Sequence, residues 1–372
     1  MTRVLKAIGL MSGTSMDGID AAILDTDGER IAAFGPARFE PYSPKMRAKL
    51  RAGVAHAAKW SGQGPLPPDI ATLERELTQA HAAAVNALLA DASLHPNEID
   101  VVGFHGHALM HRPDRRLTLQ IGSGPALAES TGIAVVNDFR TADVRAGGQG
   151  APLVPIYHQA LAGERAPVAV LNIGGVANVT FVGRSGELIA FDTGPGNAPI
   201  DDWALKHTGQ PVDTGGALAT RGRVNENVIA HLMRNPFFAA PPPKSLDRMD
   251  FSLEMARNLS AEDGAATLTA LTARAIAQAR EHLPEAPQNW IVCGGGRHNP
   301  VLMRELRAAL GPEKVTLAED AGWRGDFVEA EAFAYLAARA LRGLPISFPK
   351  TTGVPRPMTG GSLVHPQWRP AT

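Results

Sequence analysis

A run of small and acidic residues near the N-terminus is the first candidate for a binding site. It comprises Gly13, Thr14, Ser15, Met16, Asp17, Gly18, Ile19 and Asp20. Small residues let backbone N–H groups and hydroxyls crowd around a phosphate, and Asp17 and Asp20 are suited to hold Mg²⁺ directly or through water. The alternative is an ordinary hairpin turn, because glycine, serine and aspartate are also the usual turn residues.

The second candidate follows a predicted strand and comprises Asp192, Thr193, Gly194, Pro195, Gly196 and Asn197. A carboxylate at a strand end, followed by two glycines, suits a general base that faces a phosphate-lined cleft. A β-turn in which the aspartate caps its own backbone would use the same residues.

The third candidate runs from Cys293 to Asn299 and contains Gly294, Gly295 and Gly296. Three glycines before a helix allow a flat ligand such as a purine to lie against the main chain. The alternative is a tight strand-to-helix connection in which Asn299 is only the helix N-cap. Cys293 follows two apolar residues, so we interpret it as a small buried residue and not a nucleophile.

Three further residues carry polar side chains suited to substrate contacts. His107, with His105 and His111, has the composition of a metal site, but neighbouring strand residues face opposite ways, so we expect a structural or substrate-contacting role. Arg140 follows a predicted strand and suits a substrate carboxylate, with a surface ion pair as the alternative. Glu329 lies in a capping-box pattern before an apolar helix, and capping alone would explain it.

The elements that must position these loops recur in two halves of the chain. Apolar runs at 7–11 and 19–24 flank the first loop and predict a hairpin, which a strand at 30–34 extends. A long helix from Pro67 and a buried strand at 101–104 follow. The second half is predicted to contain strands at 168–173, 176–182, 187–191 and 290–292, and helices at 263–282 and from Pro300. We interpret this as a weak internal duplication.

Composition narrows the class of protein. The 372 residues include 36 Lys+Arg and 37 Asp+Glu, and a net charge of −1 argues against nucleic-acid or membrane-surface partners. The single cysteine excludes a disulfide framework and fits a reducing compartment. No run approaches the roughly 18 to 20 apolar residues of a membrane helix, and the N-terminus is too short and mixed for a signal peptide. We therefore expect a cytoplasmic protein.

Together these segments resemble the actin/hexokinase/acetate-kinase superfamily, and more narrowly the anhydro-N-acetylmuramic acid kinases. The resemblance covers nearly the whole chain and is carried by residues 9–20, 138–140, 147–155, 172–178, 192–197, 293–296 with Asn299, and 329–334. It implies an α/β fold with two ribonuclease-H-like domains around a nucleotide cleft, at residues 1–135 and 136–372, with the last helix and tail packing back on the first domain.

The resemblance also implies an activity and a set of roles. ATP and water would convert 1,6-anhydro-N-acetylmuramic acid to N-acetylmuramic acid 6-phosphate, a step of peptidoglycan recycling and amino-sugar catabolism, with Asp192 as the base that deprotonates the water. The first loop would hold the phosphates and Mg²⁺, while Arg140, Glu329 and His107 would lie on the sugar side. Further ATP contacts would come from Gly174, Gly175, Asn178, Gly194, Gly196, Asn197, Gly294, Gly295, Gly296 and Asn299.

Two rival functions stay open from the sequence. One is a kinase for another sugar or a small carboxylate on the same fold, and the other is a non-catalytic nucleotide-gated switch, which Asp192 disfavours because a switch needs no base. Three departures from the family pattern, Ala108, Ser123 and Arg145, lie near the expected sugar side. A homodimer is compatible with the sequence.

Overall fold

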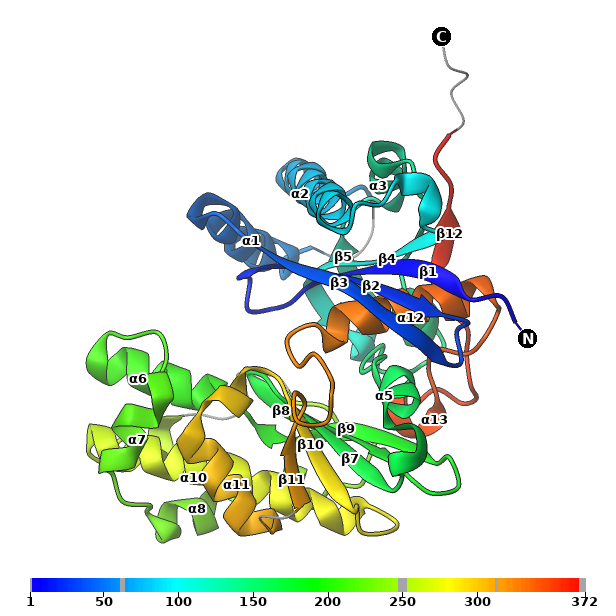
Figure 1. Cartoon of the computed structure of the whole chain (residues 1–372). Helices are drawn as coiled ribbons and strands as arrows, with labels where there is room; N and C mark the ends of the chain where they lie inside the picture. The colour runs from blue at the N-terminus through cyan, green and yellow to red at the C-terminus, as the bar shows by residue number, and fades with distance from the viewer. Residues whose placement is uncertain (1, 61–63, 247–252, 312–313, 368–372) are drawn as a thin grey trace. The chain divides into compact units, whose positions relative to one another are not determined.

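The computed structural model describes residues 2–60, 64–246, 253–311 and 314–367, which divide into two compact units (Figure 1). The first unit is formed by the stretches 1–160 and 327–372, and the second by 161–326. This division differs from the expected one at residues 135 and 136. The reason is that β6 (Val135–Asn137) pairs with β4 (Val101–Arg112) inside the first sheet, and the chain stays in the first unit up to residue 160.

The first unit is built on a seven-stranded sheet with the order β12-β6-β4-β1-β2-β3, and β5 pairs with β4 at its side. The remaining strands are β1 (Leu5–Ser12), β2 (Gly18–Thr26), β3 (Ile31–Pro41), β5 (Leu117–Ile121) and β12 (Ser362–Val364). β1, β2 and β3 form the predicted meander, with β3 longer than expected, while β4 runs parallel to β1. Residues 13–17 of the first candidate loop are therefore the turn between β1 and β2, and Gly18, Ile19 and Asp20 are the first residues of β2.

Helices cover both faces of this sheet (Figure 1). α1 (Pro44–Ala57), α2 (Pro68–Ala92) and α3 (Gly124–Thr131) lie on one face, and α12 (Val328–Leu341) lies on the other. α2 begins one residue after the predicted Pro67, which is its N-cap, and buries Ile70, Leu73, Leu77, Val85 and Leu88 at helical spacing. The shorter helices of the unit are α4 (Thr141–Arg145), α5 (Pro155–Ala162), whose last residues pass into the second unit, and α13 (Pro349–Thr352).

Two glycines allow α12 to lie directly on the sheet. Gly9 on β1 and Gly103 on β4 are register partners. A Cβ atom at Gly9 would lie 1.8 Å from the Ala330 carbonyl oxygen, and one at Gly103 would lie 2.0 Å from the Phe333 carbonyl oxygen. Because both obstacles are helix backbone, no rotamer change could relieve them. The pair of glycines thus determines where the last long helix packs.

The second unit repeats this plan with a five-stranded sheet in the order β11-β10-β7-β8-β9. Its strands are β7 (Val168–Ile173), β8 (Val176–Val182), β9 (Leu188–Pro195), β10 (Asn289–Cys293) and β11 (Val315–Leu317). Its helices are α6 (Ala198–Thr208), α7 (Ala217–Arg221), α8 (Glu226–Leu232), α9 (Pro236–Ala239), α10 (Ala261–Gln278) and α11 (Pro300–Leu310). α10 and α11 contribute Ile276, Leu302 and Leu306 to the core beside Phe181 and Phe191.

Both units therefore share one topology: an antiparallel meander whose first strand pairs in parallel with a fourth strand, beside which a fifth runs parallel. This order and these directions are those of ribonuclease-H-like domains, so the expected α/β fold class is confirmed. The structure's helices reach the predicted positions to within a few residues, since their apolar spacing and capping residues are local signals. None of the described helices has the length and apolar character that crossing a bilayer requires.

Candidate active site

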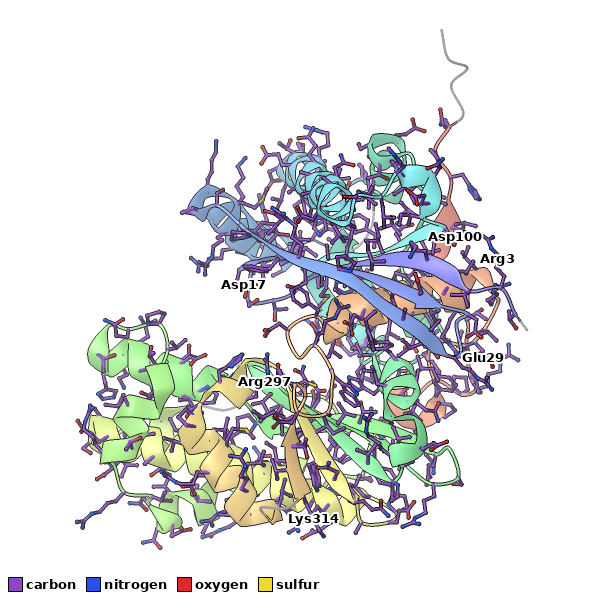
Figure 2. The ribbon with its side chains drawn as sticks, viewed as in Figure 1. Arg3, Asp17, Glu29, Asp100, Arg297 and Lys314 are labelled. Atoms are coloured by element: carbon purple, nitrogen blue, oxygen red, sulfur yellow. The ribbon has the colours of Figure 1, made fainter. Side chains whose placement is uncertain are left out.

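The first loop is an exposed turn stiffened by its own hydrogen bonds. The Met16 N–H donates to the Gly13 carbonyl oxygen at 3.1 Å, and Met16 takes a φ of 54°. The Ser15 hydroxyl donates to Asp17 Oδ1 at 2.6 Å. Asp17, labelled in Figure 2, is exposed, as are Thr14 and Ser15, and a Cβ at Gly13 would meet only the Ser15 hydroxyl, at 3.7 Å. The loop is thus a hairpin turn that also presents hydroxyls, backbone and a carboxylate to solvent.

A buried chain of hydrogen bonds supports the base of this loop. Ser12 Oγ lies 2.8 Å from the Tyr42 hydroxyl and 2.9 Å from His107 Nδ1, and the Tyr42 N–H donates to the Asp17 carbonyl oxygen at 2.8 Å. His107 has no exposed surface, and burial lowers the pKa of its imidazole to about 4. The ring is therefore neutral at pH 7, and it lies beneath the loop, where it holds Ser12. Its predicted contact with a substrate stays a prediction.

Arg140 and Glu329 form a second polar cluster in the first unit. Arg140 donates from Nε and Nη2 to His105 Nε2 at 3.1 and 3.0 Å, and from Nη1 to the Gly150 carbonyl oxygen at 3.0 Å. Burial raises the pKa of Glu329, and the Arg140 guanidinium opposes that rise. Arg140 is thus not a surface ion pair. No side chain caps α12 and Phe327 occupies the N-cap position, so capping does not explain Glu329.

The three departures from the family pattern lie in this unit as well. Ser123 is the N-cap of α3 and accepts a hydrogen bond from the Ala126 N–H at 3.3 Å. Ala108 is half-buried on β4, and Arg145 is exposed at the end of α4. Ser123 therefore has a local structural role that accounts for its presence.

Asp192 lies in the second unit, within β9 and opposite Asn178 of β8. Its N–H donates to the Lys244 carbonyl oxygen at 3.0 Å, and its Oδ2 accepts a hydrogen bond from the Leu246 N–H at 2.8 Å. Burial raises the pKa of the carboxyl to about 7, although the Leu246 hydrogen bond opposes the rise. The aspartate therefore caps a distant segment and not its own turn, and it titrates where a general base works best.

The end of the second loop is fastened to the turn between β7 and β8. The Asn197 N–H donates to the Gly174 carbonyl oxygen at 2.7 Å, and the Gly196 N–H donates to that of Gly175 at 3.0 Å. A Cβ at Gly196 would lie 2.3 Å from the Gly174 oxygen, so only glycine fits there. Gly194, two residues before Gly196, has a φ of 155°. Backbone hydrogen bonds thus join the end of the second loop to the turn between β7 and β8.

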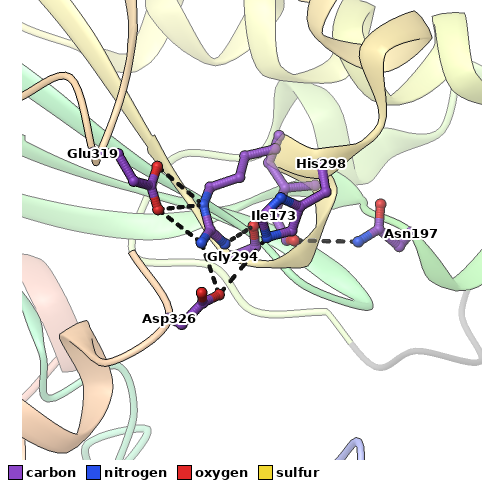
Figure 3. Close-up of polar contacts among 7 residues, drawn as sticks. Ile173, Asn197, Gly294, His298, Glu319 and Asp326 are labelled. Atoms are coloured by element: carbon purple, nitrogen blue, oxygen red, sulfur yellow. Dashed lines mark hydrogen bonds and ion pairs between the residues drawn. The ribbon is translucent and has the colours of Figure 1, made fainter. Parts of the chain in front are cut away.

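The third loop packs against the same place. Gly294 has a φ of 77°, and a Cβ there would lie 2.4 Å from Asn172 Oδ1. A Cβ at Gly296 would lie 2.4 Å from Ile173, whose carbonyl oxygen accepts from Asn197 Nδ2 at 3.3 Å (Figure 3). Asn299 is the N-cap of α11, with Oδ1 accepting from two backbone N–H groups. Cys293 is buried, as expected.

Residues 172–178, 192–197 and 293–299 thus come together at one end of the second sheet. This set includes the predicted positions Gly174, Gly175, Asn178, Asp192, Gly194, Gly196, Asn197, Gly294, Gly295, Gly296 and Asn299. Strand ends of this kind are where α/β sheets bind ligands.

Two residues that build this site are absent from the sequence predictions. Arg297 has a nearly buried side chain that donates to the Gly294 carbonyl oxygen at 2.9 Å, to Glu319 at 2.8 Å and to Asp326 at 2.7 Å (Figure 3). Asp326 is the first residue of the capping-box pattern that ends at Glu329, and it pairs with Arg297 while Phe327 occupies the N-cap position of α12. The other is Lys244, which follows three prolines. The available signals were a charged residue directly after a glycine run, for Arg297, and one directly after a proline run, for Lys244. Neither signal identifies the residues that the side chain contacts.

The fold and these loops define the class: a protein of the actin/hexokinase/acetate-kinase type, with a half-buried carboxylate beside glycine-rich strand ends. The family model for anhydro-N-acetylmuramic acid kinases matches residues 5–366, and the chain belongs to this kinase family.

Curated relatives and solved structures are similar to this chain to different degrees. The anhydro-N-acetylmuramic acid kinase of Rhizorhabdus wittichii is 55% identical over 373 residues, covering 98% of this chain and 100% of that protein. That of Bradyrhizobium diazoefficiens is 51% identical over 366 residues, with the same coverage. Among solved structures, the ROK hexokinase from Thermus thermophilus is 14% identical with a TM-score of 0.39, covering 89% of this chain and 97% of that one. The activator of the 2-hydroxyisocaproyl-CoA dehydratase from Clostridium difficile, with bound ADPNP, is 13% identical with a TM-score of 0.45, covering 91% and 96%.

Proposed function

We propose that the chain is an ATP-dependent kinase that opens 1,6-anhydro-N-acetylmuramic acid with water and phosphorylates the freed O6, giving N-acetylmuramic acid 6-phosphate and ADP. Membership of the family supports this substrate. The observation that carries the chemistry is Asp192, a half-buried carboxyl whose pKa is raised to about 7 beside the glycine-rich strand ends. Use of ATP and the single cysteine favour a cytoplasmic location.

In the proposed reaction the Asp192 carboxylate takes a proton from water, and the water oxygen forms a bond to the anomeric carbon. The bond from that carbon to O6 breaks, and O6 attacks the γ-phosphorus as the bond to the ADP oxygen breaks. Among the described residues, only the Leu246 N–H donates a hydrogen bond to this carboxylate. The hydrogen bond holds Oδ2 in place, and partial burial raises the basicity of the carboxylate.

The residues of the first loop fit a magnesium–nucleotide complex. Mg²⁺ is usually bound by one or two carboxylates together with phosphate oxygens and water, and Asp17 and Asp20 would supply those carboxylates. No group of three His, Cys, Asp or Glu side chains in the described part of the chain is arranged to hold a metal alone, which agrees with an ion bound mainly through phosphates. When bound, Mg²⁺ neutralises charge that develops on the transferred phosphoryl group.

In the second unit we propose that the glycine surface formed by residues 174–175, 194–197 and 294–296 binds the nucleotide. The open space at Gly175 and Gly295 supports this, because both are exposed and a Cβ there would meet nothing nearer than 3.6 Å, which leaves their main chain accessible to a ligand. In the first unit we propose that Arg140 binds the lactyl carboxylate and that Glu329 orients the sugar or water. The charges of Arg140 and Glu329 attract each other, and this closeness supports a shared role for the two side chains at one substrate.

The test is ATP consumption with 1,6-anhydro-N-acetylmuramic acid in ¹⁸O-labelled water. The proposal predicts stoichiometric ADP and a sugar phosphate that carries one ¹⁸O on the anomeric carbon and none on the phosphate. Labelled inorganic phosphate without sugar phosphate would indicate simple ATP hydrolysis. Phosphorylation of hexoses or acetate, with no turnover of the anhydro sugar, would indicate a different kinase, and nucleotide binding without turnover would indicate a switch.

A further inference from the structure

Lys244 of the second unit has a half-buried ammonium group whose described partners are uncharged acceptors and aromatic rings. Its Nζ donates to the carbonyl oxygens of Phe237 at 2.9 Å and Phe238 at 3.0 Å. It also lies 4.7 Å from the centre of the Phe237 ring and 5.6 Å from that of Phe191. Within the described ranges no carboxylate pairs with this cation. The ammonium group therefore satisfies carbonyl oxygens of α9 and makes cation–π contacts with the two rings.

The backbone of residues 244–246 makes hydrogen bonds with both the main chain and the side chain of Asp192. The Lys244 carbonyl oxygen accepts a hydrogen bond from the Asp192 N–H at 3.0 Å, and the Leu246 N–H donates to Asp192 Oδ2 at 2.8 Å. The same short segment is therefore fastened to α9 by a side chain and to β9 by its main chain. The segment belongs to no helix or strand, and the Lys244 side chain is what joins it to α9.

We propose that Lys244 is a positioning residue for the base: by anchoring residues 244–246 to α9, it keeps the Leu246 N–H on the Asp192 carboxylate. The inference rests on the proposed role of Asp192. Lys244 would act through the backbone, because its Nζ donates to the Phe237 and Phe238 carbonyl oxygens, whereas the described hydrogen bond to the Asp192 carboxylate comes from the Leu246 N–H. This distinguishes it from a residue that touches the reacting atoms.

The electrostatic surroundings give the inference a measurable consequence. The Leu246 hydrogen bond favours the ionised carboxylate, so its loss would raise the Asp192 pKa further above about 7. Among the described residues, three groups face the surroundings of Asp192. Burial lowers the pKa of Lys244 to about 8, and His282 Nε2 lies 3.3 Å from Lys244 Nζ. The third group is the uncharged Asn178, opposite Asp192 on β8. The base must be ionised, so activity is lost as pH falls through the Asp192 pKa.

The experiment is the pH profile of kcat for Lys244→Met in the full-length enzyme. We expect the acidic limb, near pH 7 in the parent enzyme, to move up by about one unit, which lowers kcat at pH 7 by about fivefold and leaves it nearly unchanged at pH 9. The KM for ATP should change by less than about twofold. Lys244→Arg, which keeps donors for the two carbonyls, should restore the parent limb in large part.

The matched control is Lys206→Met, because Lys206 Nζ also lies over an aromatic ring, 5.6 Å from the centre of Trp203, yet contacts nothing near Asp192. It should leave the limb in place. An unshifted limb in Lys244→Met, or an equal loss of kcat at every pH, overturns the inference and leaves Lys244 with a structural role only. If Lys244→Met does not fold, Lys244→Gln is measured instead, and an unshifted limb there is equally decisive. Asp192→Asn separates the two proposals: if it retains normal turnover, Asp192 is not the base, whatever Lys244 does.

Discussion

Asp192 shows how burial changes the chemistry of a single residue. An aspartate in water ionises near pH 4, whereas burial raises the pKa of this one to about 7 against a single backbone hydrogen bond from Leu246. A carboxylate with that pKa binds a proton strongly enough to take it from an attacking water, yet is about half ionised at neutral pH. The environment, more than the residue type, makes it a suitable base.

Asp192→Asn keeps the size of the side chain and removes the basic oxygen. We expect ATP affinity to stay within about threefold of the parent value, while kcat falls at least about a hundredfold because no group accepts the proton. Calorimetric titration with ATP and steady-state kinetics with the anhydro sugar measure the two effects. Turnover close to that of the parent enzyme would remove Asp192 from the base role.

Gly13→Val tests the first loop without disturbing the fold. A Cβ at Gly13 would meet only the Ser15 hydroxyl, at 3.7 Å, and Gly13 does not have a positive φ, so the variant should unfold at about the parent temperature. The added side chain occupies the space where a phosphate would approach, and we expect ATP affinity to fall about tenfold or more. Asp17→Ala should weaken binding in Mg²⁺ and not in EDTA. Unchanged nucleotide affinity in both variants would mean that the loop is only a turn.

At the scale of elements, glycine positions decide which helix can cover which sheet. α12 lies against β1 and β4 because Gly9 and Gly103 leave room for its backbone (Figure 1). In the second unit the same principle fastens loops: Gly196 and Gly294 let three strand ends touch. The strands and helices themselves follow from local patterns, but their contacts depend on these small residues.

Gly9→Ala should therefore destabilise the protein strongly. The new methyl group would lie 1.8 Å from a helix carbonyl oxygen, so α12 must move, at a cost of about 3 kcal/mol or more in the free energy of unfolding. Urea titration measures this directly. Gly13→Ala is the matched control, because its methyl group meets open space. Equal stability of the two variants would contradict the packing described here.

At the scale of the whole molecule, the first unit is assembled from two distant stretches and the second from one. α12 returns to the first unit after residue 326, where the Tyr335 hydroxyl donates to the Glu29 carbonyl oxygen at 3.1 Å and Arg339 donates to that of Gly28 at 2.7 Å. Phe333 and Leu336 of this helix are fully buried. The two units thus differ in how they depend on the rest of the chain.

Separate expression of fragments tests this difference. Residues 161–326 should fold alone, with a cooperative thermal transition by circular dichroism, because their sheet and core come from one continuous stretch. Residues 1–160 should not, since losing the buried side chains of α12 forfeits about 5 kcal/mol or more, comparable with the whole stability of a domain. A cooperative transition in residues 1–160 would show that α12 is dispensable to the first unit.

Many of the strands, helices and loops of this protein can be predicted from its sequence. Apolar runs of strand length, prolines at helix starts and glycine-rich strand ends are signals within about ten residues of one another, so the two meanders, the long helices and the three loops are predictable. The contacts that turn loops into a site are not. The Leu246 N–H reaches Asp192 from 54 positions away, Arg297 pairs with Asp326 from 29 away, and His107 is buried beneath Ser12 from 95 away. Such partners are set by how strands and helices pack in space, and separation along the chain does not encode that packing.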